Sequence, residues 1–132
     1  MLSLARILTR TGYHAEALAI HREIAVQVNR LPLYLVPFAD ALISAGELPE
    51  AVTIAREVVD AEPGVGHRHN WYATMLWRQG DRAAAVAHLA RAVTLNPSDR
   101  RYRRKLLRYR VVRYTWAMRS VLSFSWQRRW SR

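Results

Sequence analysis

The 132-residue chain contains no cysteine, which excludes disulfide bonds and thiol catalysis and leaves its redox compartment undetermined. It lacks any apolar run approaching the ~20 residues that a membrane-spanning helix needs. Glycine is scarce, with five residues, and none belongs to the glycine-rich loop that is typical of phosphate-binding sites. Because 51% of the residues are hydrophobic, the chain can bury a core, and its length suits one domain.

Acidic residues are absent from the last quarter of the chain. Residues 100–132 carry twelve basic side chains and no acid, whereas residues 1–99 carry nine basic and ten acidic ones. The net charge of +11 therefore belongs to the C-terminal segment. Every basic residue except Lys105 is arginine, whose forked guanidinium group suits phosphate and carboxylate groups.

The same residue types recur every 34 positions along the first 99 residues. The positions that share this interval are Gly12, Gly46 and Gly80; Ala5, Ala39 and Ala73; Leu8, Leu42 and Leu76; Ala17, Ala51 and Ala85; and Pro63 and Pro97. A period of this length predicts an array of stacked supersecondary units. The copies span residues 1–31, 32–65 and 66–99, and the first lacks only its three opening positions.

Each copy is predicted to form two helices joined by a tight turn. In the third copy, residues 67–78 form the first helix and residues 82–95 the second. Gly80 can take the left-handed conformation after a helix end, and Asp81 is a good N-cap for the next helix. The small residues recurring in both helices allow the two backbones to approach closely, so a larger side chain there would overpack the contact.

This pattern of large and small residues resembles the tetratricopeptide repeat family. The matching positions are His69, Tyr72, Ala73, Leu76, Ala85, Leu89 and Pro97 in the third copy, Leu35, Phe38, Ala39, Leu42, Ala51, Ala55 and Pro63 in the second, and Met1, Leu4, Ala5, Leu8 and Ala17 in the first. The first copy departs from the pattern at His21 and Asn29, where a large apolar residue and a proline are expected. The resemblance implies an all-α solenoid of three helix-turn-helix repeats over residues 1–99, followed by a further helix.

The N-terminal residues have two interpretations. Arg6 and Arg10, with no acid before Glu16, suit a mitochondrial targeting peptide. Because Ala5 and Leu8 fall in the repeat register, we favour the exposed side of a first repeat helix and expect a cytoplasmic protein.

No cluster of polar residues suggests a catalytic centre. His67 and His69 are two positions apart and do not share a helix face, and neither an HExxH motif nor paired cysteines accompany them. We interpret them as surface residues at the start of a helix. The acids of the second helices, such as Glu57 and Asp60, are typical of a solvated face. We therefore expect no enzyme activity, no cofactor and no metal site.

In the family, the first helices of the repeats line a concave groove that holds a peptide or helix of a partner protein. The resemblance therefore implies groove residues in each copy and, in the same register, beyond the third copy. These partner-binding candidates are Arg6, Val36, Asp40, Asn70, Thr74, Trp77, Arg101, Arg104 and Arg108. We expect a mixed peptide groove, apolar at one end and cationic at the other, rather than a carboxylate clamp, which Asp40 would oppose.

Residues 100–132 are predicted to form a long helix with Asp99 as its N-cap, because arginine and leucine favour helix and no proline or glycine follows Pro97. An apolar stripe at helical spacing is expected to cover the end of the last repeat, as a capping helix does. The stripe consists of Leu107, Val111, Tyr114, Met118, Val121 and Leu122. Tyr109 lies off the stripe and is expected to face solvent with the arginines.

The arginine-rich side of this helix predicts an anionic partner. An acidic protein, RNA with bases stacked on aromatic rings, and an anionic membrane surface all fit the composition. The candidate residues for binding a polyanion or a membrane are Arg103, Lys105, Arg110, Arg113, Trp116, Trp126, Arg128, Arg129 and Trp130. We favour a protein partner, because the resemblance implies a non-enzymatic adaptor or assembly module. An RNA-binding or membrane-associated scaffold is the alternative.

Overall fold

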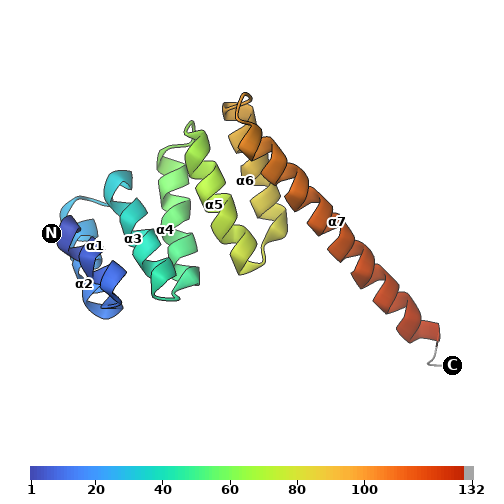
Figure 1. The fold of residues 1–132 in the computed structure, drawn as a ribbon, viewed down its shortest axis with the longest axis horizontal. Coiled ribbons are helices and arrows are strands. Elements are labelled where there is room, and N and C mark those ends of the chain that lie inside the picture. The colour runs from blue at the N-terminus through green and yellow to red at the C-terminus, as the bar shows by residue number, and fades with distance from the viewer. Residues whose placement is uncertain (130–132) are drawn as a thin grey trace.

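The computed structural model describes residues 1–129, with side chains placed as far as residue 120. These residues form helices and no strand (Figure 1). In chain order the helices are α1 (Leu2–Thr11), α2 (His14–Gln27), α3 (Pro32–Ser44), α4 (Leu48–Ala61), α5 (Gly66–Gln79), α6 (Arg82–Leu95) and α7 (Arg100–Arg129). None of the described helices combines the length and the apolarity needed to cross a bilayer.

The first six helices form three pairs, and each pair packs on the next. The pairs are α1 with α2, α3 with α4, and α5 with α6, and they fall within residues 1–31, 32–65 and 66–99. α7 packs on α6 and then extends away from the stack, so the C-terminal end lies far from the N-terminus (Figure 1). The predicted all-α solenoid is therefore confirmed.

The turns and helix starts follow the predicted chemistry. Gly80 ends α5 in the left-handed conformation with φ of 99°, and the equivalent glycines at 12 and 46 have φ of 89° and 85°. The carboxylate of Asp81 accepts a hydrogen bond from the amide of Ala84 at 3.1 Å and caps α6. Asp99 likewise accepts from the amide of Arg101 at 2.8 Å and caps α7.

The recurring small residues lie at the centre of the helix pairs. The alanines at 5, 39 and 73 of the first helices and at 51 and 85 of the second helices have no exposed surface. Leu42 and Leu89 are equally buried and fill the space beside them. Because these side chains are enclosed on all sides, a larger side chain there would have to displace its neighbours.

The connection between α2 and α3 explains why Asn29 replaces the proline of the other copies. Asn29 and Arg30 adopt the left-handed conformation, with φ of 49° and 55°. Proline cannot take this conformation, whereas asparagine tolerates it. The amide of Arg30 donates to the carbonyl of Ala25 at 2.9 Å, which closes the end of α2. Its guanidinium group then forms two bonds with Glu57 of α4, at 2.7 and 2.8 Å.

The prediction of the packed face of α7 was wrong. Leu106 and Tyr109 are buried and Tyr102 is half-buried, so these residues hold α7 on the last repeat. The predicted stripe is exposed at each of its described positions, which are Leu107, Val111, Tyr114 and Met118. Val121 and Leu122 belong to the part of α7 whose side chains are not described.

The physical reason for this error is that α7 has two apolar tracks, and the shorter one makes the better contact. Tyr109 stacks on Trp77 of α5 with ring centroids 3.9 Å apart. The same side of α7 carries Lys105, whose ammonium group reaches polar partners on α5. A charged residue within this track hides it from hydrophobic periodicity, although its aliphatic stem can pack against apolar surface.

Two histidines are buried, contrary to the surface role expected for His69. His21 lies flat against Phe38 in the core, and neither of its ring nitrogens has a hydrogen-bond partner within the described structure. It therefore occupies the site of the large apolar residue that the repeat pattern requires. His67 is exposed, as expected.

His69 and His88 form a pair between α5 and α6. Nε2 of His69 lies 2.9 Å from the carbonyl oxygen of Pro63, so it must be the protonated nitrogen and donate. Nδ1 of His69 then accepts from Nδ1 of His88, at 3.0 Å. These two hydrogen bonds join the loop before α5, α5 itself and α6.

Replacing a buried alanine by leucine should destabilise the fold by overpacking. We expect Ala85→Leu to lower the free energy of unfolding by about 1–3 kcal/mol, measured by urea denaturation followed by circular dichroism. Ala87→Leu is the matched control, because Ala87 lies exposed on the same helix. Equal stability of the two variants would contradict the packing role of the repeated alanines.

Two neighbouring leucines test which face of α7 is packed. Leu106→Ala should cost about 2–4 kcal/mol, because the side chain is buried, whereas Leu107→Ala should change the free energy of unfolding by less than about 0.5 kcal/mol. Thermal and urea unfolding of both variants would measure this. The reverse order would restore the face expected from the sequence.

The buried histidines should make the fold less stable in mild acid. Burial lowers the pKa of His21, and burial together with the charge of His69 lowers the pKa of His88, below the ordinary value of 6.5. The unfolded chain then binds more protons, so the free energy of unfolding falls as the pH drops below about 6.5. We expect His21→Leu to reduce the loss of melting temperature between about pH 7.5 and 5.5.

His67→Leu is the control for this experiment, because the side chain is exposed. His21→Leu should also stabilise the fold near neutral pH by about 1 kcal/mol, because it removes two buried polar atoms that have no partner. A pH dependence identical to that of the unchanged chain would show that His21 does not contribute to acid sensitivity.

Candidate binding groove

The first helices of the pairs, together with the start of α7, form one continuous face. α1 contacts α3 directly. The indole Nε1 of Trp71 on α5 donates to Asp40 of α3 at 3.2 Å, and Lys105 of α7 reaches across to Asn70 of α5. Side chains from α1, α3, α5 and α7 therefore meet in chain order along this face, which we call the groove.

The N-terminal end of the groove is hollow. A cavity of about 660 Å³ lies between α1, α2 and α3, and a neighbouring one of about 450 Å³ lies between α1 and α3. Both are lined by Arg6, Pro37 and Asp40; Ile7 and Ala41 line the larger one and Leu33 and Val36 the smaller. Buried His21 also borders the larger cavity.

Pro37 changes the backbone hydrogen bonding of α3 at this end of the groove. It lies inside α3, where proline has no N–H to donate. The carbonyl of Leu33, one turn earlier, therefore lacks the intrahelical partner that residue 37 would otherwise supply. Leu33 and Pro37 both line the smaller cavity, so this change in the backbone hydrogen bonding of α3 lies beside the groove.

The C-terminal end of the groove is cationic and already hydrogen-bonded. Nζ of Lys105 donates to Oδ1 of Asn70 at 2.8 Å and to Oγ1 of Thr74 at 2.6 Å. Burial and the nearby charge of Arg108 lower the pKa of this ammonium group. Lys105 thus fixes α7 against α5, and exposed Arg108 supplies charge that has no acid on α7 to neutralise it.

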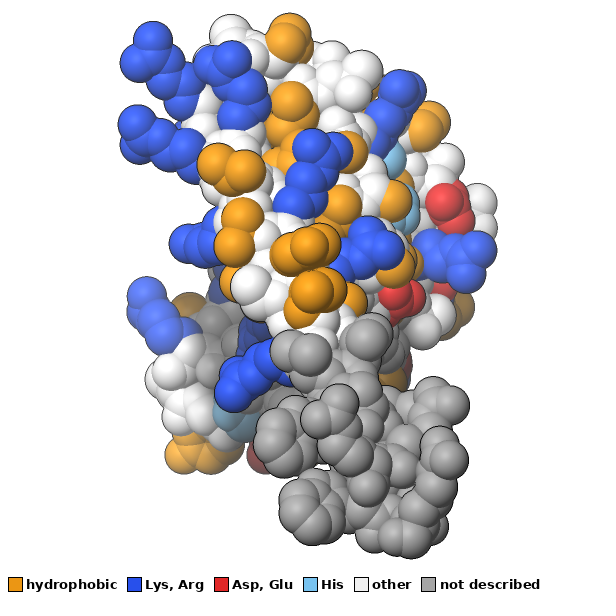
Figure 2. All heavy atoms as spheres, turned by 90° about the vertical axis from the view of Figure 1, so that its right-hand side faces the viewer, with side chains coloured by type: hydrophobic (Ala, Val, Ile, Leu, Met, Phe, Trp, Pro, Cys, Tyr) orange, Lys and Arg blue, Asp and Glu red, His pale blue; other side chains and the backbone are white. Residues whose placement is uncertain are grey.

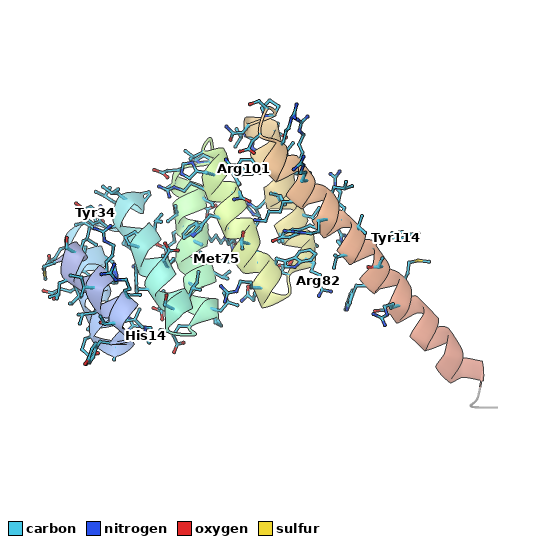
Figure 3. All side chains as sticks on the ribbon, viewed as in Figure 1. His14, Tyr34, Met75, Arg82, Arg101 and Tyr114 are labelled. Atoms are coloured by element: carbon cyan, nitrogen blue, oxygen red, sulfur yellow. The ribbon has the colours of Figure 1, made fainter. Side chains whose placement is uncertain are left out.

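Aromatic rings and one arginine set the angle of α7. Tyr109 stacks on Trp77, and the guanidinium group of Arg82 lies 5.4 Å from the ring of Trp77 and 5.3 Å from that of Trp116. Arg82 begins α6 and lies where α6 faces α7 (Figure 3). Because cations are attracted to the faces of indole rings, Arg82 joins the two helices at this point.

The structure separates the predicted partner-binding residues into three groups. Arg6, Val36 and Asp40 border the two cavities. Asn70, Thr74 and Trp77 contact α7 through Lys105 and Tyr109. On α7, Arg104 and Arg108 are exposed, and Arg101 pairs with Asp99 at 3.0 Å. Their role in binding remains a prediction.

The residues predicted to bind a polyanion or membrane are also dispersed. Arg103, Arg110 and Arg113 are exposed on α7, whereas Lys105 faces α5 and Trp116 lies over Arg82. Trp126, Arg128 and Arg129 belong to the part of α7 whose side chains are not described, and Trp130 lies outside the described residues.

Sequence reasoning missed several residues of the groove. Trp71, Arg82 and Tyr109 hold neighbouring helices together, and each lies outside the positions that the repeat pattern specifies. Pro37 was visible as a proline within a predicted helix, which is a signal for a freed carbonyl. In the part of the chain that the structure describes, no three His, Cys, Asp or Glu side chains cluster so as to hold a metal ion.

Comparison with known proteins identifies the repeat. Two models of the tetratricopeptide repeat match residues 1–23 and 66–109, which together make up about half of the chain. The TPR repeat-containing thioredoxin TTL4 of Arabidopsis thaliana is 32% identical over 83 residues. That alignment covers 63% of this chain and only 12% of the plant protein, so the likeness concerns a small part of the relative.

Solved structures resemble the whole fold. MamA of Desulfovibrio magneticus RS-1 superposes with a TM-score of 0.73 at 14% identity, over 99% of this chain and 76% of MamA. The type III secretion chaperone SycD of Yersinia enterocolitica was solved with a peptide of the translocator YopD. It superposes with a TM-score of 0.67 at 14% identity, over 90% of this chain and 91% of SycD. The first TPR of Spaghetti (RPAP3), bound to the HSP90 peptide SRMEEVD, superposes with a TM-score of 0.70 at 12% identity. This superposition covers 83% of this chain and 87% of the RPAP3 domain.

At such identities the structural likeness concerns the fold alone. The 34-residue period, the stacked helix pairs and the two family matches agree with one another. The chain belongs to the tetratricopeptide repeat family.

Proposed function

We propose that this chain is a non-enzymatic interaction module that holds a peptide or helix of another protein in its groove. The observation that carries the proposal is the hollow between α1 and α3, where two adjoining cavities share their lining residues. The solved complexes of SycD with a translocator peptide and of an RPAP3 repeat domain with an HSP90 peptide support it, because both have this fold.

The chemistry of the groove indicates what kind of segment would fit. Ile7, Pro37 and Ala41 give the larger cavity apolar walls, so it suits an apolar side chain. Arg6 and Arg10 border the same cavity and favour an acidic group beside that anchor.

The cationic end supplies a second attraction. Arg104 and Arg108 are exposed at the start of α7, next to the part of the groove formed by Asn70 and Thr74. Side chains of four helices line the groove, so a segment that reaches from the cavities to α7 passes α3 and α5 on the way. We therefore expect a partner segment with an apolar anchor near α1 and acidic residues toward α7.

Peptide selection tests this proposal directly. Peptides of roughly 12 residues, long enough to cross the groove, would be selected from a random displayed library on the immobilised chain. Their affinities would then be measured by fluorescence anisotropy. Arg6→Glu, Val36→Asp and Arg108→Glu should each weaken binding by at least about tenfold, the effect of losing ~1.4 kcal/mol.

Matched controls carry the same changes on the second helices. Arg91→Glu on α6 and Val26→Asp on α2 alter exposed residues of the outer side and should leave the affinity unchanged. Circular dichroism would show that every variant remains folded. Peptides that bind groove variants and control variants equally well would exclude the groove as the binding site.

A further inference from the structure

The outer side of α7 carries an exposed apolar stripe. Leu107, Val111, Tyr114 and Met118 follow one another at intervals of four, three and four residues, so they share one helix face. Their exposed fractions are 65%, 53%, 67% and 46%. We call these four residues the outer stripe. Figure 2 shows hydrophobic side chains gathered along this side of the molecule.

The outer stripe faces away from the repeats. Tyr109 and Leu106, which hold α7 on the stack, lie about 200° and 260° around the helix from Leu107, at the 100° per residue of an α-helix. Trp116, over Arg82, lies on the packed side as well. Beyond it α7 continues away from the repeats, and Tyr114 points away from them (Figure 3).

Arginines border the outer stripe along both edges. By the same helical geometry, Arg110 lies on one edge and Arg108 and Arg119 lie on the other. These three side chains are exposed, and residues 100–120 contain no acid. Figure 2 shows Lys and Arg side chains around the hydrophobic ones, with the few acids at the margin of this face. The surface is therefore amphipathic and of a single charge sign.

The positive charge beside the outer stripe determines which kind of partner can cover it. A second copy of α7 would bring two sets of arginines together, so self-association is opposed by repulsion. A nucleic acid would satisfy the arginines but would leave the aliphatic side chains Leu107, Val111 and Met118 without a partner. An anionic bilayer satisfies both, because apolar side chains enter the acyl boundary while arginines reach the lipid phosphates.

The geometry also suits a flat surface. A single projecting helix forms no pocket, and the outer stripe lies on the side opposite the packed residue Tyr109, with Leu106 about a quarter turn away from it. A flat surface can therefore contact the outer stripe of α7 while the repeats keep their position. Lys105, on the side of α7 that meets α5, keeps its bonds to Asn70 and Thr74 in that arrangement, so the groove stays open.

We propose that the outer stripe and its flanking arginines bind the surface of an anionic lipid bilayer, with α7 lying in the headgroup plane. The outer stripe lies on a different side of α7 from the residues that contact the groove, and only Arg108 is shared with the proposed function. The arginines would bind the lipid phosphates, and the apolar side chains of the outer stripe would enter the apolar layer beneath them.

Co-sedimentation with vesicles tests the proposal. The full chain should bind phosphatidylcholine vesicles that contain roughly 30% phosphatidylglycerol and should not bind pure phosphatidylcholine vesicles. The combined variant Leu107→Gln, Val111→Gln and Met118→Gln should lose at least about tenfold in partitioning, because no apolar group remains to enter the bilayer. Arg108→Gln, Arg110→Gln and Arg119→Gln together should lose at least as much.

Two matched triple variants control for the loss of apolar surface and of charge. Leu4→Gln, Val26→Gln and Leu31→Gln remove exposed apolar residues of the repeats. Arg56→Gln, Arg78→Gln and Arg91→Gln remove three exposed charges of the repeats. Both controls should bind anionic vesicles like the unchanged chain, and circular dichroism would confirm that all variants are folded.

Single-site labelling would locate the contact, because a chain without cysteine takes a thiol-reactive dye at one introduced position. A polarity-sensitive dye at Val111→Cys should shift to the blue on anionic vesicles, whereas the same dye at Arg91→Cys should not. Polyuridine would be tested in parallel. Loss of vesicle binding only with arginine removal, no shift at position 111, or RNA binding in place of vesicle binding would each overturn the proposal.

Discussion

The close approach of helix backbones at fully buried alanines is the contact on which the rest of the structure depends. Ala39 and Ala51 in the second pair, and Ala73 and Ala85 in the third, have no exposed surface, so a larger residue there would have to push the helices apart. This spacing sets how each pair forms and how the next pair stacks on it. The first helices consequently lie side by side, and the groove between α1 and α7 is a result of that stacking rather than of any one polar contact.

The docking of α7 then divides its side chains between two surfaces. Tyr109, stacked on Trp77, and Lys105, bonded to Asn70 and Thr74, hold the inner side of the helix against α5. The opposite side is left to solvent, and it carries both the apolar stripe and the arginines. A rotation of α7 by half a turn would bury the outer stripe and expose Leu106 and Tyr109 in its place. A few aromatic and polar contacts therefore fix the rotation of α7 about its axis, and this rotation determines which side chains of α7 are available to a partner.

The cavities of the groove and the outer stripe are compatible because they lie on separate parts of the molecule, with Arg108 between them. The cavities beside α1 and α3 suit an apolar anchor with an acidic neighbour, and the outer stripe of α7 suits a planar anionic surface. A module of this kind could hold a protein segment near a membrane while its repeats remain in water. The exposed ion pairs, such as Arg22 with Glu50, contribute little to this arrangement, since solvent screens them.

The sequence by itself determined the repeat and its local chemistry. A 34-residue period, glycines at left-handed turns and the caps Asp81 and Asp99 depend on nearest neighbours along the chain, so the residues alone predict them. The repeat register also predicted Arg6, Val36 and Asp40 as groove residues, and the packing of α1 on α3 places them beside the two cavities. Tertiary structure decided the burial of His69, the bonding of Lys105 and the packed face of α7. These depend on which side chains of distant helices meet, and periodicity could not choose between two apolar tracks whose contacts lie on another helix.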